Sequence, residues 1–365
     1  MDNKIGIINH WMVNNYGAVL LAYALDKKIH DLGYNVETVS WLPDEVHKPW
    51  KFSIIKKTGF VHYVFRLGYF IVFILPRKKN FAHFRRMINT SSEKYSDLTL
   101  PQIEKNYDKI IIGGDQLWNC KINYFNINNF LPFIKEKRRK LVYAASLAQD
   151  NMRKGFEKKF CQLASGFGYI TTREKRATEI IEEITGLSAP RVADPAFLLT
   201  KEEWTNLIEE DIQYKNKKFV FVYQVQSDAI VSKFANKIAK EKKLEVIYCP
   251  FPIRYPMHCK IKPYISPEKW LFYMKNAEYV FTDAFHGLVF SLIFNKQFAV
   301  EISEYGKDTH SRITNLLKLV GLEDRLFSMD NFCDIDSKID YDFINEFIKK
   351  DREQSIRHIH SMLRL

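Results

Sequence analysis

The feature that most constrains the fold is a recurring order of short apolar run, polar or glycine-containing loop, and helix. Ile5–Ile8 is apolar throughout, the loop 14–18 contains Gly17, and residues 20–29 then carry apolar side chains at helical spacing. Continuous apolar runs of this length are typical of parallel strands that are buried on both faces. Further strands, rich in apolar residues, are expected at residues 36–40, 109–112, 141–145, 168–171, 219–223, 245–248 and 279–282.

These runs fall into two sets, and the chain is long enough for two domains. A length of 365 residues suits two cores of about 150 to 180 residues each. We predict an α/β fold with two Rossmann-like open-sheet domains that face a central cleft. The expected domains are residues 1–205 and 206–335, joined near the charged stretch 209–218, and residues 336–365 are predicted to form C-terminal helices.

The cysteines and the N-terminal sequence favour a reducing compartment. The five cysteines are widely spaced and never form a C-x-x-C pair, so they support neither a disulfide framework nor a zinc site. The sequence that follows Met1 lacks the basic, apolar and small-residue regions of a secretory signal. We therefore expect a cytoplasmic protein.

The net charge of +12 is concentrated in one segment. Residues 51–90 carry nine lysines and arginines and no acidic residue, and they include the most apolar run of the chain, residues 60–75, interrupted by Arg66. The run is short for a membrane span, and the arginine disfavours one. We expect an interfacial helix that meets anionic headgroups or a pyrophosphate, and an interdomain or dimer helix is the alternative. This local concentration of charge does not indicate a nucleic-acid partner.

The strongest candidate for catalysis follows the apolar run 279–282. Asp283 comes directly after the predicted strand, and His286 lies in the first turn of the predicted helix. Ligands of open parallel sheets bind at the carboxyl ends of the strands, and a helix N-terminus favours an anion and tunes a nearby histidine. His286 is thus a candidate acid or base. In the alternative interpretation, Asp283 caps the helix and His286 bonds to the backbone.

Two further loops follow strands in the first half of the chain. The loop Gly113–Asn119 combines two glycines, which allow close backbone approach, with the polar side chains of Asp115, Gln116 and Asn119 and with Trp118, which could stack on a sugar ring. The alternative is a tight turn with Asp115 as an N-cap. Arg173 follows the run 168–171 and could bind a phosphate or carboxylate with its planar guanidinium, as could Arg312. The alternative for Arg173 is a solvated ion pair with Glu174 at a helix start.

Motifs of several other enzyme classes are missing from the sequence. It contains no G-x-x-x-x-G-K-[ST] phosphate loop, no G-x-G-x-x-G, no H-E-x-x-H and no G-x-S-x-G. Support is therefore lacking for the usual nucleotide hydrolases, zinc proteases and serine hydrolases.

Six segments form an ordered pattern along the chain. They are Lys4–Ile8 with Asn14–Ala18, Gly113–Asn119, Tyr143–Ser146, Thr172–Glu174, Val192–Pro195 with Leu198–Thr200, and Thr282–Gly287. Together they resemble the polysaccharide pyruvyl transferase family over roughly residues 4–330. The resemblance implies a glycosyltransferase-B-like architecture and transfer of the pyruvyl group of phosphoenolpyruvate to sugar hydroxyls, which forms a pyruvate ketal and releases phosphate.

The resemblance also implies roles for individual residues. His286 matches the family's histidine, with Asp283 beside it to orient it or act as a base, and Arg173 matches the R-E/D segment. Many members have S-R-L-H at the histidine motif, where this chain has Ala284 in place of the arginine. The expected ligands of the donor phosphate or carboxylate are Arg173, Arg312 and Lys175. The expected acceptor-binding residues are Asn15, Tyr16, Asp115, Gln116, Trp118 and Asn119.

The expected partners follow from this assignment. Phosphoenolpyruvate is the co-substrate, no other cofactor is expected, and a loosely held magnesium ion would leave no readable motif. The acceptor implied is a polyprenyl-pyrophosphate-linked oligosaccharide of a bacterial cell-surface or capsular polysaccharide, with residues 51–90 docking the enzyme on the inner face of the membrane. A nucleotide-sugar-dependent glycosyltransferase and a non-catalytic membrane- or polysaccharide-binding protein are the alternatives.

Overall fold

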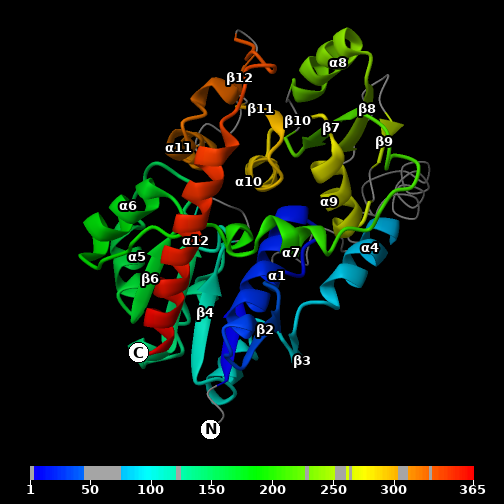
Figure 1. Cartoon of the computed structure of the whole chain (residues 1–365). Helices are drawn as coiled ribbons and strands as arrows, with labels where there is room; N and C mark the ends of the chain where they lie inside the picture. Colours follow the sequence, from blue (N-terminus) through cyan, green and yellow to red (C-terminus); the bar gives the residue numbers. More distant parts are fainter. Residues whose placement is uncertain are drawn as a thin grey trace, which may run out of the picture. The chain divides into compact units, whose positions relative to one another are not determined.

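The computed structural model describes residues 4–44, 75–120, 125–226, 230–250, 260–262, 265–302, 311–328 and 331–365 (Figure 1). Within these ranges the chain forms two compact units. Of the described residues, unit 1 contains those in the ranges 4–44, 85–198 and 349–365, and unit 2 contains those in the ranges 75–84 and 199–348. Each unit is built around its own parallel sheet.

The sheet of unit 1 has the strand order β3-β2-β1-β4-β5-β6, and every neighbouring pair is parallel. This is the strand order of dinucleotide-binding folds. The strands β1 to β3 are added toward one edge of the sheet, and β4 to β6 are then added toward the other edge, starting beside β1. The strands are β1 (Ile5–Ile8), β2 (Val36–Trp41), β3 (Thr90–Tyr95), β4 (Lys109–Gly113), β5 (Lys140–Ala145) and β6 (Tyr169–Thr172).

Both faces of this sheet are covered, which explains the continuous apolar runs. Ile110 and Ile112 pack into one core cluster, while Ile111 between them packs into the other. Such alternation requires apolar side chains at every position of a central strand. The covering elements are α1 (Tyr16–Asp31), η4 (Leu100–Lys105), η5 (Ile127–Phe130), η6 (Lys137–Arg139), α5 (Glu157–Ala164), α6 (Lys175–Thr185), η7 (Pro195–Leu198) and the C-terminal half of α12 (Tyr341–Leu363).

The last turns of α12 are fastened to unit 1 by side chains. The Nδ1 atom of His358 lies 2.9 Å from the hydroxyl of Tyr169, and that of His360 lies 3.0 Å from the hydroxyl of Tyr34. Ile359 and Met362 are fully buried in the same core cluster as Ile111. The long helix at the C-terminus (Figure 1) therefore completes the core of a unit whose sheet begins at residue 5.

The sheet of unit 2 has the order β12-β11-β10-β7-β8-β9 and is also parallel throughout the described strands. Its strands are β7 (Phe219–Gln224), β8 (Glu245–Pro250), β9 (Lys260–Ile261), β10 (Tyr279–Thr282), β11 (Gln297–Glu301) and β12 (Leu326–Phe327). Its helices are α4 (Leu75–Arg85), which ends at the unit boundary, α7 (Lys201–Thr205), α8 (Val231–Lys242), α9 (Pro267–Asn276), α10 (Phe285–Ile293), α11 (Ser311–Val320) and η9 (Glu323–Arg325).

Local sequence signals set several helix starts. The Ser266 side chain accepts a hydrogen bond from the N–H of Lys269, and Pro267 occupies the first turn of α9, as the sequence predicts. Thr200 and Glu203 form a reciprocal capping box at α7. Asn15 caps α1 by accepting a hydrogen bond from the N–H of Ala18.

The predicted α/β class with two open parallel sheets is confirmed. The predicted domain boundaries differ from the two units, because the division lies between Leu198 and Leu199 and the chain from Lys349 onward, within α12, belongs to unit 1. Strands β3, β9, β11 and β12 were not among the predicted runs. Of these, β3 has the sequence TSSEKY, which lacks an apolar run because it is an edge strand.

Most of the basic apolar segment 51–90 lies outside the described residues. Its described part contains α4, on which Lys78 and Lys79 are exposed and Arg77 is buried. No helix in the part of the chain that the structure describes is long and apolar enough to cross a membrane.

Candidate active site

In unit 2, the residues that follow β10 form a tight turn into α10. The Thr282 hydroxyl donates to the carbonyl of Tyr223 at 2.7 Å and accepts a hydrogen bond from the N–H of Ala284 at 3.0 Å. Gly287 packs directly on Thr282, and a Cβ at this glycine would lie 2.2 Å from the Thr282 hydroxyl oxygen. The turn therefore needs a glycine one residue after His286, which explains the sequence His286-Gly287.

Asp283 holds the loop that follows the neighbouring strand β7. One carboxylate oxygen accepts the N–H of Val225 at 2.6 Å, and the other accepts the N–H of Gln226 at 2.7 Å. Burial raises the pKa of Asp283 to about 7, against the opposing effect of these hydrogen bonds, and the nearby carboxylate of Glu301 adds to the rise. Both oxygens face the backbone of the loop, so the geometry gives Asp283 a positioning function.

His286 and Arg312 lie at the starts of two helices. His286 is the second residue of α10, and its ring centroid is 5.3 Å from that of Phe285. Arg312 is the second residue of α11, and its guanidinium carbon lies 5.4 Å from the centroid of the same Phe285 ring. The ring of Phe285 thus packs against both the imidazole of His286 and the guanidinium of Arg312. The two side chains lie at the N-termini of α10 and α11, and helix N-termini favour an anion nearby.

Glu301 is a buried acid at this edge that the sequence did not single out. It ends β11, which is paired with β10, and its carboxylate accepts the N–H of Ile230 at 2.8 Å. The register places Glu301 next to Asp283, since Thr282 is opposite Val300. An acidic residue at the end of the apolar run 298–300 was the available signal.

In unit 1, Asp115 is the centre of the loop after β4. It accepts the N–H of Gln116 at 2.7 Å, and its other oxygen lies 3.5 Å from Nδ1 of His10, which follows the adjacent strand β1. Burial alone would raise the pKa of Asp115, but the hydrogen bond with His10 and the charge of Arg173 hold it well below its usual range. The side-chain amide of Asn119 donates to Gln116 at 3.0 Å. The predicted residues Asp115, Gln116 and Asn119 are therefore brought together, and His10 was missed.

Arg173 is buried within an ion-pair network. Only 1% of its side chain is exposed, and it donates to Glu174 at 2.9 Å, to Asp194 at 2.6 Å and to the carbonyl of Gly114 at 3.1 Å. Burial lowers the pKa of Arg173, but the carboxylates of Glu174, Asp194 and Asp115 outweigh it and raise the pKa above its usual value. Three carboxylates already surround its charge, which favours a structural function for Arg173, and the binding of a donor anion by Arg173 stays a prediction.

Two predicted acceptor residues lie in the core. Trp118 is 1% exposed, its ring is stacked on Phe130 at 4.9 Å, and the edges of other aromatic rings pack against it. A sugar therefore cannot stack on it in this conformation. Tyr16 is fully buried in the first turn of α1. Asn15, which caps that helix, is partly exposed, and Lys175 is exposed at the first position of α6.

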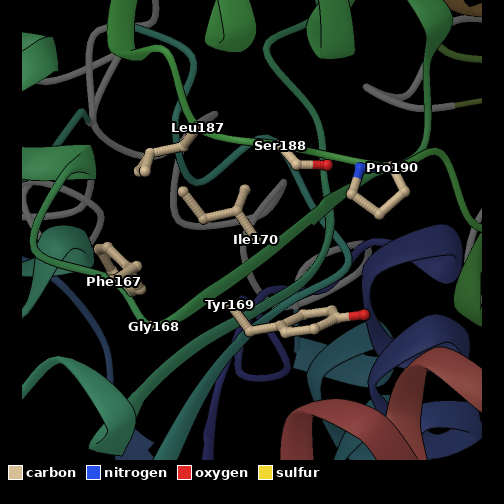
Figure 2. Close-up of a pocket in the computed structure, with 7 residues that line it drawn as sticks. All are labelled: Phe167, Gly168, Tyr169, Ile170, Leu187, Ser188 and Pro190. Atoms are coloured by element: carbon tan, nitrogen blue, oxygen red, sulfur yellow. The ribbon is translucent and has the colours of Figure 1, made fainter.

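A cavity of about 270 Å³ lies at the opposite end of β6 from Arg173. Figure 2 shows Phe167, Ile170 and Leu187 gathered in it, with the ring of Tyr169 directed away from them. The remaining lining residues are Gly168, Ser188 and Pro190. This apolar lining contains no cationic side chain, so the cavity does not suit a phosphate or carboxylate. Among the described residues, no cluster of three or more histidine, cysteine or acidic side chains could hold a metal ion.

The family model for polysaccharide pyruvyl transferases matches residues 15–301. The chain belongs to this family. The match covers the Asp115 loop of unit 1 and the His286 turn of unit 2 of this pyruvyl transferase family member, whereas His10 and Arg312 lie outside it. The family indicates a transferase that acts on a polysaccharide. None of the curated proteins matches the sequence.

Solved structures share the fold of this family member at low sequence identity. The UDP-GlcNAc 2-epimerase of Methanocaldococcus jannaschii, in complex with UDP-GlcNAc and UDP, is similar with a TM-score of 0.53 and 9% identity, over 98% of this chain and 99% of that one. The UDP-N-acetylglucosamine 2-epimerase from Rickettsia bellii has a TM-score of 0.53 and 12% identity, over 99% and 96%. The expected glycosyltransferase-B-like fold is thereby confirmed, since the likeness extends over both sheets.

Proposed function

We propose that this protein transfers the pyruvyl group of phosphoenolpyruvate to two hydroxyls of a sugar in a cell-surface or capsular polysaccharide precursor, forming a pyruvate ketal. The observation that carries the proposal is the position of His286, the histidine of the family motif, in the first turn of α10, where Arg312 packs on the ring of the preceding Phe285. Family membership supports the reaction class.

The donor site in this proposal is the edge of unit 2. Phosphoenolpyruvate has two anionic groups, a phosphate and a carboxylate, which the guanidinium of Arg312 and the N-termini of α10 and α11 would bind. Ala284, at the place of the family arginine, is the N-cap of α10. Arg312, which contacts the ring of Phe285 from the helix α11, would supply the positive charge that the family arginine supplies in other members.

The reaction needs one proton delivered and two removed. His286 protonates the methylene carbon of the enol phosphate, which becomes the methyl group and leaves an oxocarbenium-like carbon. One sugar hydroxyl adds to this carbon and loses its proton, the carbon–oxygen bond to phosphate breaks, and the second hydroxyl adds and loses its proton. The products are the cyclic ketal and inorganic phosphate, which accepts the remaining proton. Asp283 maintains the geometry by holding residues 225 and 226.

The acceptor site is proposed for unit 1. Asp115, Gln116 and Asn119 supply carboxylate and amide groups of the kind that bind sugar hydroxyls, and Asn15 lies in the loop after β1. Lys175, exposed at the start of α6 in the same unit, is a candidate cation for a phosphate of the acceptor. The surplus of carboxylates around Arg173 supports a neutral ligand at this edge over an anion.

The test is an assay of purified protein with phosphoenolpyruvate and lipid-linked oligosaccharides ending in galactose, mannose or N-acetylmannosamine. Phosphate release and the mass gain of a pyruvate ketal are measured together. The proposal expects both with the wild type and neither with His286→Ala. The matched control is His30→Ala, which removes an exposed histidine of unit 1. Full activity of His286→Ala would refute its catalytic role.

A nucleotide-sugar-dependent transferase is the second candidate, because two of the similar solved structures hold UDP or UDP-GlcNAc. One of these is MnaA of S. aureus, solved with UDP, at a TM-score of 0.51 and 14% identity over 99% of this chain and 90% of that one. Consumption of a UDP- or GDP-sugar in the same assay, without use of phosphoenolpyruvate, would favour this candidate. Absence of turnover with every donor would favour a binding protein.

A peripheral membrane location is part of the proposal. Lys78, Lys79 and Arg86 are exposed in the described part of the basic segment and could meet anionic headgroups. Co-sedimentation with vesicles of anionic lipid, lost at high salt and reduced in the triple alanine variant, is the expected result. Equal reaction rates with lipid-linked and water-soluble acceptors, together with no vesicle binding, would contradict it.

A further inference from the structure

The ion-pair network of unit 1 carries more negative than positive charge. Asp115, Glu174 and Asp194 all act on the single guanidinium of Arg173; Asp115 follows the central strand β4, Glu174 follows the edge strand β6, and Asp194 follows the bridge between Thr172 and Arg191. His10 beside Asp115 and Tyr143 beside Asp194 are further titratable groups that face the network, and Lys175 is exposed outside it. A buried site with surplus carboxylates repels phosphate and favours hydrogen-bond donors.

Within this network, the two oxygens of Glu174 differ. Oε1 accepts hydrogen bonds from Nε of Arg173 at 2.9 Å and from the hydroxyl of Ser146 at 2.7 Å. Oε2 is buried and has no hydrogen-bond partner among the residues that the structure describes, although Glu174 is 4% exposed. A buried carboxylate oxygen without a donor is unfavourable, so a donor is expected to fill this position.

The location of Glu174 indicates where that donor comes from. Glu174 is the N-cap of α6 and directly follows the strand β6 and Arg173, at the edge of the sheet where ligands of such folds bind. Asn9, at the same edge after β1, is 2% exposed, and its side-chain NH₂ group also has no partner among the described residues. A polyol carries several hydroxyls, each of which donates and accepts hydrogen bonds, so it suits an edge with an unsatisfied acceptor after β6 and an unsatisfied donor after β1, three strands away.

We propose that Glu174 is a binding residue for the acceptor, whose sugar hydroxyl donates to Oε2, and that Arg173 positions Glu174 for this contact. The inference rests on the proposed function in placing the acceptor in unit 1. It assigns an uncharged polyol to this edge, and it gives the Arg173–Glu174 pair a function in acceptor affinity.

The test uses Glu174→Gln, because the existing hydrogen bonds determine how the amide sits. The amide oxygen stays with Arg173 and Ser146, which both donate, so the NH₂ group takes the position of Oε2 and replaces an acceptor with a donor. Asp194→Asn is the matched control, since it also removes one carboxylate charge from Arg173 but leaves Oε2 unchanged. Binding of oligosaccharides ending in galactose, mannose or N-acetylmannosamine is titrated by calorimetry in the absence of phosphoenolpyruvate and nucleotide sugars.

The expected result is that Glu174→Gln weakens binding of the preferred sugar by roughly 10- to 100-fold, the range for a hydrogen bond to a charged group, while Asp194→Asn keeps wild-type affinity. Equal weakening in both variants would show that Glu174 acts only through Arg173, and this result would overturn the inference. A wild-type protein that binds none of the sugars would overturn it as well.

If Glu174→Gln does not fold, Glu174→Asp is the second variant. It keeps the negative charge but moves the carboxylate oxygen away from the position of Oε2, and it is expected to weaken sugar binding in the same way. The binding titration contains no phosphoenolpyruvate, so it is independent of the pyruvyl transfer reaction. A protein that binds the sugar but does not transfer a pyruvyl group would therefore refute the proposed function and leave this inference intact.

Discussion

The backbone of Gly287 lies so close to Thr282 that a Cβ would come within 2.2 Å of the threonine hydroxyl oxygen and 2.7 Å of its Cβ. Thr282 cannot move aside easily, because it is fully buried and its hydroxyl donates to the carbonyl of Tyr223 on the adjacent strand. The contact joins the end of β10 to the first turn of α10. It therefore determines where His286 stands relative to the sheet.

Gly287→Ala is expected to destabilise the protein by roughly 1–3 kcal/mol, the usual loss from an overpacked core. Urea unfolding measures it. In the double variant with Thr282→Ala, which removes the hydroxyl and methyl groups, the loss should be smaller than the sum of the two single losses. Strictly additive losses would contradict the proposed contact.

Arg173→Ala is expected to be strongly destabilising, by about 3–5 kcal/mol, because it leaves the buried carboxylates of Glu174 and Asp194 without their cation. Thermal and urea unfolding measure the change. Removal of the exposed Lys175, two residues further on, should leave stability unchanged. An Arg173→Ala variant that is as stable as the wild type but no longer binds phosphoenolpyruvate would instead support the prediction that Arg173 binds the donor.

Arg312→Ala is expected to raise the KM for phosphoenolpyruvate by roughly 10- to 100-fold, because a charge-assisted hydrogen bond to the donor is lost. Steady-state phosphate release measures this, with acceptor held at saturation. Lys318→Ala, an exposed cation on the same helix α11, is the control and should keep the wild-type KM. An unchanged KM in Arg312→Ala would remove Arg312 from the donor site.

The stability of unit 2 is expected to depend on pH through Asp283. Its pKa rises from 3.8 to about 7 on folding, mainly because of burial, so the folded protein holds a proton that the unfolded chain releases. The free energy of unfolding should therefore fall as pH rises from about 4 to about 7 and then level off. Asp283→Asn should flatten this slope in urea titrations, whereas the exposed Asp342→Asn should not. A slope that is the same in all three proteins would show that Asp283 does not set it.

Much of the fold could be predicted because a central parallel strand is buried on both faces, and this burial requires apolar residues at consecutive positions of its sequence. Ile110, Ile111 and Ile112 are all buried, two on one face of the sheet and one on the other. A strand buried in this way needs a continuous run of apolar residues, which can be recognised in the sequence. Caps such as Ser266 likewise act within one turn of the helix they begin. By contrast, β3 is an edge strand of polar residues and left no such pattern.

The candidate site was predictable only in part. Residues directly after strands, such as Asp115 and His286, could be selected because loops there meet at one edge of a sheet. Which of them are neighbours depends on strand order: His10 meets Asp115 because β1 pairs with β4, and Glu301 lies next to Asp283 because β11 pairs with β10. Burial also depends on packing between distant segments, and it made Trp118 a core residue and Arg173 the centre of an ion-pair network.

The sequence by itself thus determined the α/β class, the positions of the central strands and the turns where polar side chains would gather, because these follow from interactions within a few residues. Only the tertiary structure decided which charges face one another and which side chains are enclosed. Arg173 and Asp194 are 21 residues apart in sequence, and they meet because the chain brings the two segments together after β6.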